Sequence, residues 1–184
     1  MRALVYVMGP SGAGKDAVLN QARVGLRPGE KIAFAHRYIT RPPDPQHENY
    51  VALTEAEFAT RRDAGLFAFH WRAHGFQYAI GTEIDAWRRA GFLVVISGSR
   101  EHFKSLAPPP TAVVPILITA SPEIQAARLA ARGRESAAGI AARLERNAAL
   151  TLEDPAITKL DNSGALSDAT SRFLDLLRRL AATA

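Results

Sequence analysis

One glycine-rich segment constrains the fold more than any other, and it reads Gly9-Pro10-Ser11-Gly12-Ala13-Gly14-Lys15-Asp16. The apolar residues Leu4–Met8 before it predict a buried strand. After it, apolar side chains recur at helical spacing at Ala17, Val18, Ala22 and Leu26. A strand, a glycine-rich turn and a helix in this order gather backbone N–H groups at a helix N-terminus. The segment therefore predicts a binding site for an anion.

The segment matches the pattern G-x-x-x-x-G-K of a phosphate-binding loop, or P-loop, between a strand and a helix as that motif requires. In such a loop the backbone cradles the phosphates of a nucleotide, and the lysine reaches the β- and γ-phosphates. We therefore expect residues 9–16 to bind ATP, with Lys15 as a catalytic residue. A glycine-rich turn that only joins strand to helix is the alternative, and the lysine in this context disfavours it.

The residue after the lysine departs from the motif. A serine or threonine hydroxyl normally ligates Mg²⁺ there, but this chain has Asp16. The strand predicted at Phe92–Ile96 ends in Ser97-Gly98-Ser99, without the carboxylate that usually completes the metal site. We expect the acidic ligand to have moved from strand to loop, so that Asp16 binds Mg²⁺. The alternative is an acid that only stabilises the helix dipole, by ~0.3–1 kcal/mol.

The rest of the chain predicts an α/β fold, a parallel sheet flanked by helices. Further strands are expected at Lys31–Ala35, Phe92–Ile96, Val113–Thr119 and Ala156–Leu160. Helix-start signals occur at Thr54-Glu55-Ala56-Glu57 and Ser121-Pro122-Glu123, and Leu166–Leu180 has the apolar spacing of a closing helix. A chain of 184 residues fits a single domain.

Two regions break the alternation of strands and helices. Residues 36–80 hold four of the five histidines and predict a substrate-binding subdomain inserted into a core of residues 1–35 and 81–184. Residues from about 128 to 146 are rich in alanine and arginine, with Gly133 and Gly139 as hinge candidates, and predict a helical lid.

Composition narrows the function classes. The chain has no cysteine, which excludes disulfides and thiol chemistry. Its longest apolar stretches fall short of the ~20 residues that span a bilayer, and no cleavage signal follows Met1–Met8, so we expect a cytoplasmic protein without a membrane partner. The net charge of +5 favours anionic partners. No stacking aromatics interleave with a basic face, which argues against nucleic acid.

The chain resembles the guanylate-kinase-like P-loop kinases over nearly its whole length, and within them the ribose 1,5-bisphosphate phosphokinases of phosphonate degradation. The similar segments are Met8–Asp16, Arg37–Pro42, Glu48–Tyr50, His70–Gly75, Ser97–Arg100, Arg132–Glu135 and Asp161–Ser163. Guanylate kinases have Lys-Ser or Lys-Thr at the end of the P-loop. Lys15-Asp16 is similar to the ribose bisphosphate enzymes instead.

Two departures from guanylate kinases concern the acceptor. Those enzymes bind the monophosphate with two arginines three positions apart, whereas Arg41 is followed by Asp44 at the second position. They place a glutamate before the tryptophan to accept hydrogen bonds from guanine, whereas His70 precedes Trp71 here. We therefore expect GMP to bind poorly.

The resemblance implies roles for further residues. Arg37, Arg41 and Arg100 are the acceptor-binding arginines, with His36 as a fourth cationic candidate, and Tyr50 and Tyr78 resemble the tyrosines that bind the acceptor phosphate. Arg132 and Arg143 of the lid resemble the arginines that contact the transferring phosphoryl group. Asn162 resembles the asparagine on the adenine side of the nucleotide. The alternatives are a solvated basic patch for the arginines, half-buried aromatic side chains for the tyrosines, and a capped turn for the segment with Asn162.

The expected reaction transfers the γ-phosphoryl group of ATP, with Mg²⁺, to ribose 1,5-bisphosphate, giving 5-phospho-α-D-ribose 1-diphosphate (PRPP) and ADP. We expect a small phosphorylated sugar as the only partner of a monomer or homodimer. The alternatives are a guanylate or other nucleoside monophosphate kinase, and a non-catalytic guanylate-kinase-like binding module. The intact Gly14-Lys15 pair and the arginine-rich lid argue against the module.

Overall fold

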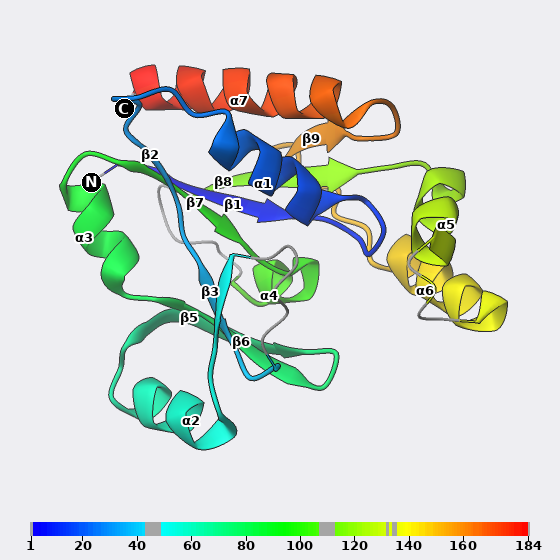
Figure 1. Ribbon diagram of the computed structural model, residues 1–184, viewed down its shortest axis with the longest axis horizontal. Coiled ribbons are helices and arrows are strands. Elements are labelled where there is room, and N and C mark those ends of the chain that lie inside the picture. The colour runs from blue at the N-terminus through cyan, green and yellow to red at the C-terminus, as the bar shows by residue number, and fades with distance from the viewer. Residues whose placement is uncertain (1, 43–48, 107–112, 132, 134–135, 184) are drawn as a thin grey trace.

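The computed structural model describes residues 2–42, 49–106, 113–131, 133 and 136–183. Its central sheet has five parallel strands in the order β2-β7-β1-β8-β9 (Figure 1). Their bounds are β1 Leu4–Met8, β2 Ile32–Phe34, β7 Leu93–Ser97, β8 Val113–Thr119 and β9 Thr158–Asp161. The predicted α/β fold with a parallel sheet is confirmed, and each strand begins and ends within two residues of its expected bounds.

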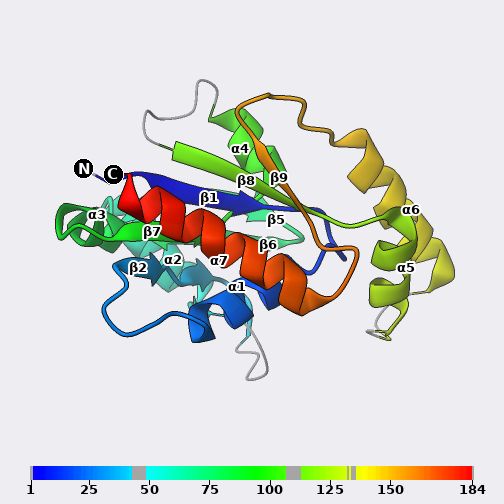
Figure 2. The same ribbon diagram turned by 90° about the horizontal axis from the view of Figure 1, so that it is seen from above.

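Helices cover both faces of this sheet (Figures 1 and 2). On one face α1 (Lys15–Val24) and the closing helix α7 (Leu166–Ala182) pack against Val5 and Val7 of β1. On the other face α3 (Glu83–Arg89) and α4 (Arg100–Ser105) pack against the alternate residues of the same strand. Because β1 is buried on both faces, it is a continuous apolar run, as parallel strands usually are.

Four strands between Arg37 and Gly81 form a second sheet in the order β4-β3-β6-β5. The strands are β3 Arg37–Ile39, β4 Tyr50–Ala52, β5 Phe67–Ala73 and β6 Phe76–Gly81. Only β3 and β4 are parallel, whereas β6 pairs antiparallel with both β3 and β5. The hairpin β5–β6 turns at His74 and Gly75, whose φ angles of 50° and 79° fit a two-residue turn of the primed type.

One helix of this region was expected from its capping pattern. The Thr54 Oγ1 accepts a hydrogen bond from the backbone N–H of Glu57 at 3.1 Å, and α2 (Glu55–Asp63) follows. In Figure 1 the second sheet and α2 lie below the core sheet, on the side of α3 and α4. The four strands themselves were not predicted from the sequence.

The two remaining helices, α5 and α6, lie beyond the carboxyl end of the core sheet (Figure 1). Helix α5 (Pro122–Ala131) begins after Ser121, as its capping signal predicts, and α6 (Ala137–Ala149) begins after Ser136. No residue of α6 is buried, so this helix is held by a few contacts rather than by a core. Within the described ranges, no helix has the length and apolar character needed to cross a membrane.

Candidate active site

The glycine-rich loop joins β1 to α1 at the carboxyl end of the core sheet (Figure 1). Gly12 and Gly14 have φ angles of 85° and 80°, a region that side chains with a Cβ disfavour. A Cβ on Gly9 would lie 2.6 Å from the carbonyl oxygen of Ile118. Three glycines are therefore required to shape a loop that leads into the N-terminus of α1, a backbone geometry that suits an anion.

Two side chains, those of Asn162 and Arg128, hydrogen-bond to the backbone of this loop. Asn162, which is 1% exposed, donates from Nδ2 to the carbonyl oxygen of Ala13 at 2.8 Å. The Arg128 guanidinium donates to the same carbonyl at 3.2 Å and to the Asn162 carbonyl at 2.9 Å. The Oδ1 atom of Asn162 is buried with no hydrogen-bond partner in the described structure, which leaves an acceptor for a ligand N–H group. Arg128 was not singled out from the sequence, because nothing in its spacing distinguishes it from the other arginines nearby.

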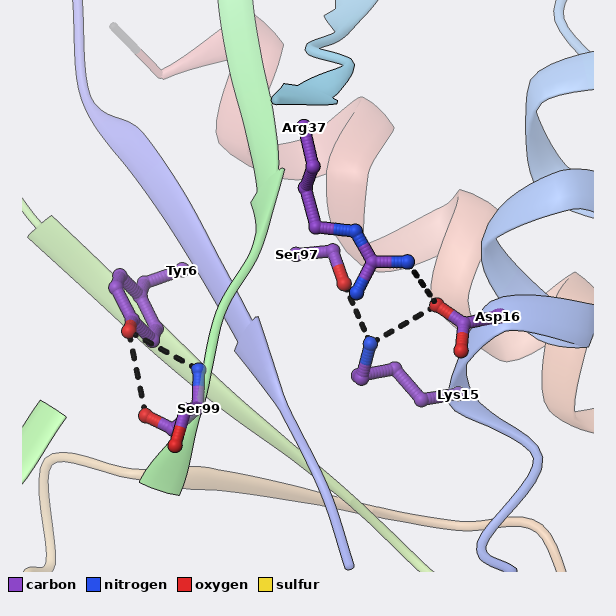
Figure 3. A network of polar contacts seen from close by, with 6 residues as sticks. All are labelled: Tyr6, Lys15, Asp16, Arg37, Ser97 and Ser99. Atoms are coloured by element: carbon purple, nitrogen blue, oxygen red, sulfur yellow. Dashed lines mark hydrogen bonds and ion pairs between the residues drawn. The ribbon is translucent and has the colours of Figure 1, made fainter. Parts of the chain in front are cut away.

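Lys15 and Asp16 belong to a network of charged groups at the mouth of the loop (Figure 3). The Lys15 Nζ donates to the Asp16 Oδ1 at 3.0 Å and to the Ser97 Oγ at the end of β7. The Arg37 guanidinium, at the start of β3, reaches the same Asp16 oxygen at 3.4 Å. One carboxylate therefore lies between the lysine of the P-loop and an arginine of the second sheet.

This network bears on the fit of a divalent cation. Mg²⁺ is commonly bound through one or two carboxylates together with phosphate oxygens and water. In the part of the chain that the structure describes, no group of three or more His, Asp or Glu side chains could hold a metal ion. Asp16 supplies a single carboxylate beside the P-loop lysine, so the residues present fit a metal whose other ligands come from a nucleotide and water.

The structure brings three of the expected acceptor-binding residues together: Arg37 on β3, Tyr50 on β4, and Arg41, which lies two residues after β3. Arg37 and Tyr50 are register partners across these strands, and the Arg41 guanidinium lies 4.9 Å from the centre of the Tyr50 ring. The Tyr50 hydroxyl donates to the Pro42 carbonyl at 2.7 Å. His36, by contrast, contacts Glu83 of α3 through its Nε2 at 3.4 Å, whereas Arg37 next to it contacts Asp16.

Tyr78 belongs to a stack of rings that connects the second sheet to the core. It stacks on Trp71 of β5 with ring centres 5.6 Å apart, and Trp71 stacks on His102 of α4 at 4.9 Å. The Nδ1 atom of His102 lies 2.8 Å from the hydroxyl of the buried Tyr6. Burial, reinforced by the nearby charge of His70, lowers the pKa of His102, and burial raises the pKa of Tyr6. The neutral forms of both side chains are favoured at this junction.

The expected lid residue Arg143 lies on α6 and reaches the P-loop. Its guanidinium donates to the Ser11 Oγ at 2.8 Å. One turn further along, the Asn147 Nδ2 donates to the Ser11 carbonyl at 3.0 Å and to the Gln125 Oε1 at 2.8 Å. Asn147 and Gln125 were missed, since neither lies in a recognisable motif. Arg132 lies outside the described residues.

Arg100 is placed differently from the expectation that it binds the acceptor. Its guanidinium donates to the carbonyl oxygens of Asn147 and Leu150 at 2.9 and 2.8 Å, and to the Asn147 Oδ1 at 2.9 Å. These are the last carbonyls of α6, where a cation is favoured by the helix dipole. Arg100, the first residue of α4, thus holds the C-terminal end of α6, whereas Arg37 contacts Asp16.

A pocket opens beside this network, between α1 and the strands β2 and β7. Its wall includes Asp16, Arg37 and Ser97 at the P-loop, and Asn20 and Arg23 further along α1. Asn20 and Arg23 carried no recognisable signal in the sequence.

Comparisons with known proteins agree with this geometry. No family model matches the chain. The ribose 1,5-bisphosphate phosphokinase PhnN of Burkholderia pseudomallei is 51% identical over 179 residues, which cover 97% of this chain and 96% of that protein. The enzyme of the same name from Desulfomicrobium baculatum is 46% identical over 91% of this chain and 90% of its own length.

Among solved structures, guanylate kinase from Anaplasma phagocytophilum superposes with a TM-score of 0.71 at 19% identity, covering 97% of this chain and 85% of the other. That similarity shows the guanylate-kinase-like P-loop fold and no more. The sequence identities, which extend over almost the full length of both chains, show the closer relationship. The chain therefore belongs to the family of ribose 1,5-bisphosphate phosphokinases.

Proposed function

We propose that this protein transfers the γ-phosphoryl group of ATP to the 1-phosphate of ribose 1,5-bisphosphate, giving 5-phospho-α-D-ribose 1-diphosphate and ADP. The observation that carries the proposal is the 51% identity to a phosphokinase of that name over 97% of the chain. An oxygen of the 1-phosphate forms a bond to the γ-phosphorus, and the bond from that phosphorus to the bridging oxygen of ADP breaks. The attacking oxygen is already anionic, so no general base is required.

Catalysis then depends on positioning and charge neutralisation. The backbone of residues 9–16 holds the nucleotide phosphates, and Lys15 contacts the γ-phosphoryl group as it transfers. Arg143 approaches the same loop from α6 through Ser11, at 2.8 Å, and Arg132 completes the pair of lid arginines. Asn162 supports the loop and offers its Oδ1 to the adenine amino group.

Mg²⁺ bound at Asp16 would neutralise the developing charge on the phosphates. An acid beside a triphosphate needs such compensation, since like unit charges ~4 Å apart repel by ~4 kcal/mol at an effective dielectric of 20. Ser97 at the end of β7 shares the Lys15 ammonium group with Asp16. Asp16 and Ser97, the two positions that exchange roles in our hypothesis, therefore lie next to each other at the Lys15 ammonium group.

On the acceptor side, Arg37 and Arg41 neutralise phosphate and Tyr50 and Tyr78 orient it. The side chain before Trp71 is His70, which offers no carboxylate to a guanine edge. A guanine base would therefore have N–H donors buried without an acceptor, at a cost of ~1–3 kcal/mol each. The site thus favours an acceptor that has phosphates and no base.

The remaining expectations form part of the same proposal. Residues 36–80 act as the substrate-binding subdomain, and residues of about 128–146 as a lid whose helix α6 has no buried residue and can move without exposing a core. The reaction takes place in the cytoplasm and serves phosphonate degradation. Neither nucleic acid nor a membrane takes part.

A coupled ADP-release assay tests this function. The purified protein is given ATP, Mg²⁺ and one acceptor at a time: ribose 1,5-bisphosphate, GMP, AMP or dTMP. We expect the highest kcat/KM with ribose 1,5-bisphosphate. A higher kcat/KM with GMP would make the protein a guanylate kinase, and ADP release with none of the four would favour a non-catalytic binding module.

A further inference from the structure

The pocket beside α1 has two ends with different surroundings. Its inner end lies at the P-loop, where Asp16, Arg37 and Ser97 line it, and the first two of these contact each other. Its outer end lies along α1, where Asn20 and Arg23 line it.

The spacing along α1 sets the distance between these ends. Asp16, Asn20 and Arg23 recur at intervals of four and three residues, so they share one face of the helix. Seven residues of helix span about 10 Å. Between the two ends the wall is apolar, with Leu19 from the helix and Val95 from β7. A ligand in this pocket therefore meets charged groups at both ends and carbon surface in the middle.

The charges of the pocket favour an anion at the outer end. Two guanidinium groups, those of Arg23 and Arg37, face a single carboxylate, that of Asp16. Asp16 is held by Lys15 and Arg37 at the inner end. Arg23 is exposed, and among the described residues no carboxylate forms an ion pair with it. A ligand phosphate at the outer end would meet a cation without having to displace an acidic side chain of the structure described here.

We infer that Arg23 binds the 5-phosphate of the acceptor while the 1-phosphate lies near Lys15. This inference rests on the proposed function, and it names the part of the protein that recognises the second phosphate. A sugar ring with a phosphate at each side has charged ends separated by carbon, which is the order of surfaces along the pocket. Arg23 thereby makes the enzyme selective for a bisphosphate over a sugar with only the reacting phosphate.

The test compares acceptors that differ in one phosphate. Steady-state kinetics are measured for the wild type, Arg23→Ala and Arg23→Lys with ribose 1,5-bisphosphate and with ribose 1-phosphate, which lacks the 5-phosphate. Ribose 5-phosphate, which lacks the reacting phosphate, is used as a competitive inhibitor. Arg27→Ala is the matched control, since it removes the same charge just beyond α1 and does not line the pocket.

We expect Arg23→Ala to lower kcat/KM for ribose 1,5-bisphosphate by roughly 10- to 100-fold, as loss of a charged hydrogen bond to phosphate does. The Ki of ribose 5-phosphate should rise by a similar factor. The kcat/KM for ribose 1-phosphate and the KM for ATP should stay within twofold of the wild type. Arg23→Lys should recover part of the loss, and Arg27→Ala should change none of these values.

Equal losses with both acceptors would overturn the inference, because they would show that Arg23 acts on the fold or on transfer itself. No loss with ribose 1,5-bisphosphate would overturn it as well, and Arg23 would then serve only the end of α1. The proposed function fails separately, when the wild-type protein releases no ADP with ribose 1,5-bisphosphate. That result is seen before any variant is measured.

Discussion

The P-loop side and the second sheet are built in different ways. The P-loop follows a fully buried five-residue strand, and its Ala13 carbonyl accepts hydrogen bonds from the buried Asn162 and from Arg128. The second sheet begins with two strands of three residues, β3 and β4. Its candidate acceptor-binding side chains Arg37 and Tyr50 are the first residues of these strands. Backbone geometry defines the first region and side-chain charge defines the second. Changes in the first should affect every reaction of the protein, and changes in the second only the use of the acceptor.

The largest effect is expected from the P-loop lysine. Lys15→Ala should lower kcat by ~10²–10³ with any acceptor, because it removes the charge that neutralises the transferring phosphoryl group. The thermal midpoint should hardly change, since the lysine donates to Asp16 and Ser97 at the loop mouth and its ammonium group is no part of the apolar core. Lys104→Ala, a change of an exposed lysine on α4, is the control. Near-wild-type turnover in Lys15→Ala would disprove the P-loop assignment.

An acceptor-side variant should separate the two regions. Arg41→Ala should lower kcat/KM for ribose 1,5-bisphosphate by about 10- to 100-fold, since one charged hydrogen bond to phosphate contributes ~1.5–3 kcal/mol. The KM for ATP should be unchanged. Arg62→Ala, on the exposed side of α2, removes the same charge without this effect. A parallel rise in the KM for ATP would show that the two regions do not act separately.

Asp16 connects the regions, because its carboxylate meets Lys15 on one side and Arg37 on the other. Asp16→Ala should raise the Mg²⁺ concentration for half-maximal activity by roughly 10-fold and lower kcat, as loss of a metal-site group does. Asp16→Ser should be partly rescued by Ser97→Asp. An unaltered Mg²⁺ dependence and kcat in Asp16→Ala would leave this carboxylate with a role at the helix dipole only.

A smaller effect is expected where α6 meets the P-loop. Asn147→Ala removes the Nδ2 donor to the Ser11 carbonyl, along with the bond to Gln125 and the Oδ1 that accepts from Arg100. The bond to the P-loop alone contributes ~1 kcal/mol, about a 5-fold effect on nucleotide binding. The KM for ATP should rise by about that factor while the KM for the sugar stays constant. Glu145→Ala, exposed on the same helix, is the control. A rise in the KM for the sugar alone would place α6 on the acceptor side instead.

The smallest effect concerns the junction between the two regions, where His102 lies between Trp71 and Tyr6. Its pKa is lowered by burial and by the charge of His70, so the unfolded chain takes up a proton more readily than the folded one. The free energy of unfolding should therefore fall as the pH decreases below about 6.5, the pKa of an unperturbed histidine. Denaturant titrations at several pH values should show a smaller decrease in His102→Gln. An identical pH dependence in the variant would contradict this origin.

The core could be predicted from the sequence because its signals are local. An apolar run such as Leu4–Met8 and a loop with glycines at required positions each specify their own conformation. The strands β3 and β4 could not be predicted, because three residues carry too little periodicity, and β3 pairs with β6 about 40 positions further along the chain.

The same distinction holds for individual side chains of the site. Lys15 and Asp16 are identified by their place in a motif. Arg100 was expected at the acceptor but binds the last carbonyls of α6, because the contacts of an arginine depend on elements far along the chain. Arg23 could not be identified from the sequence either, because the pocket that it lines forms only where β2 and β7 lie beside α1.

A competition experiment tests the central claim most directly. Equal concentrations of ribose 1,5-bisphosphate and GMP are mixed with limiting ATP, Mg²⁺ and the protein, and the two diphosphate products are followed by phosphorus NMR. Their ratio reports the ratio of the two kcat/KM values. We predict that ATP is consumed to form the sugar diphosphate, with little GDP. Formation of GDP in excess over the sugar diphosphate would contradict the assignment of the acceptor site.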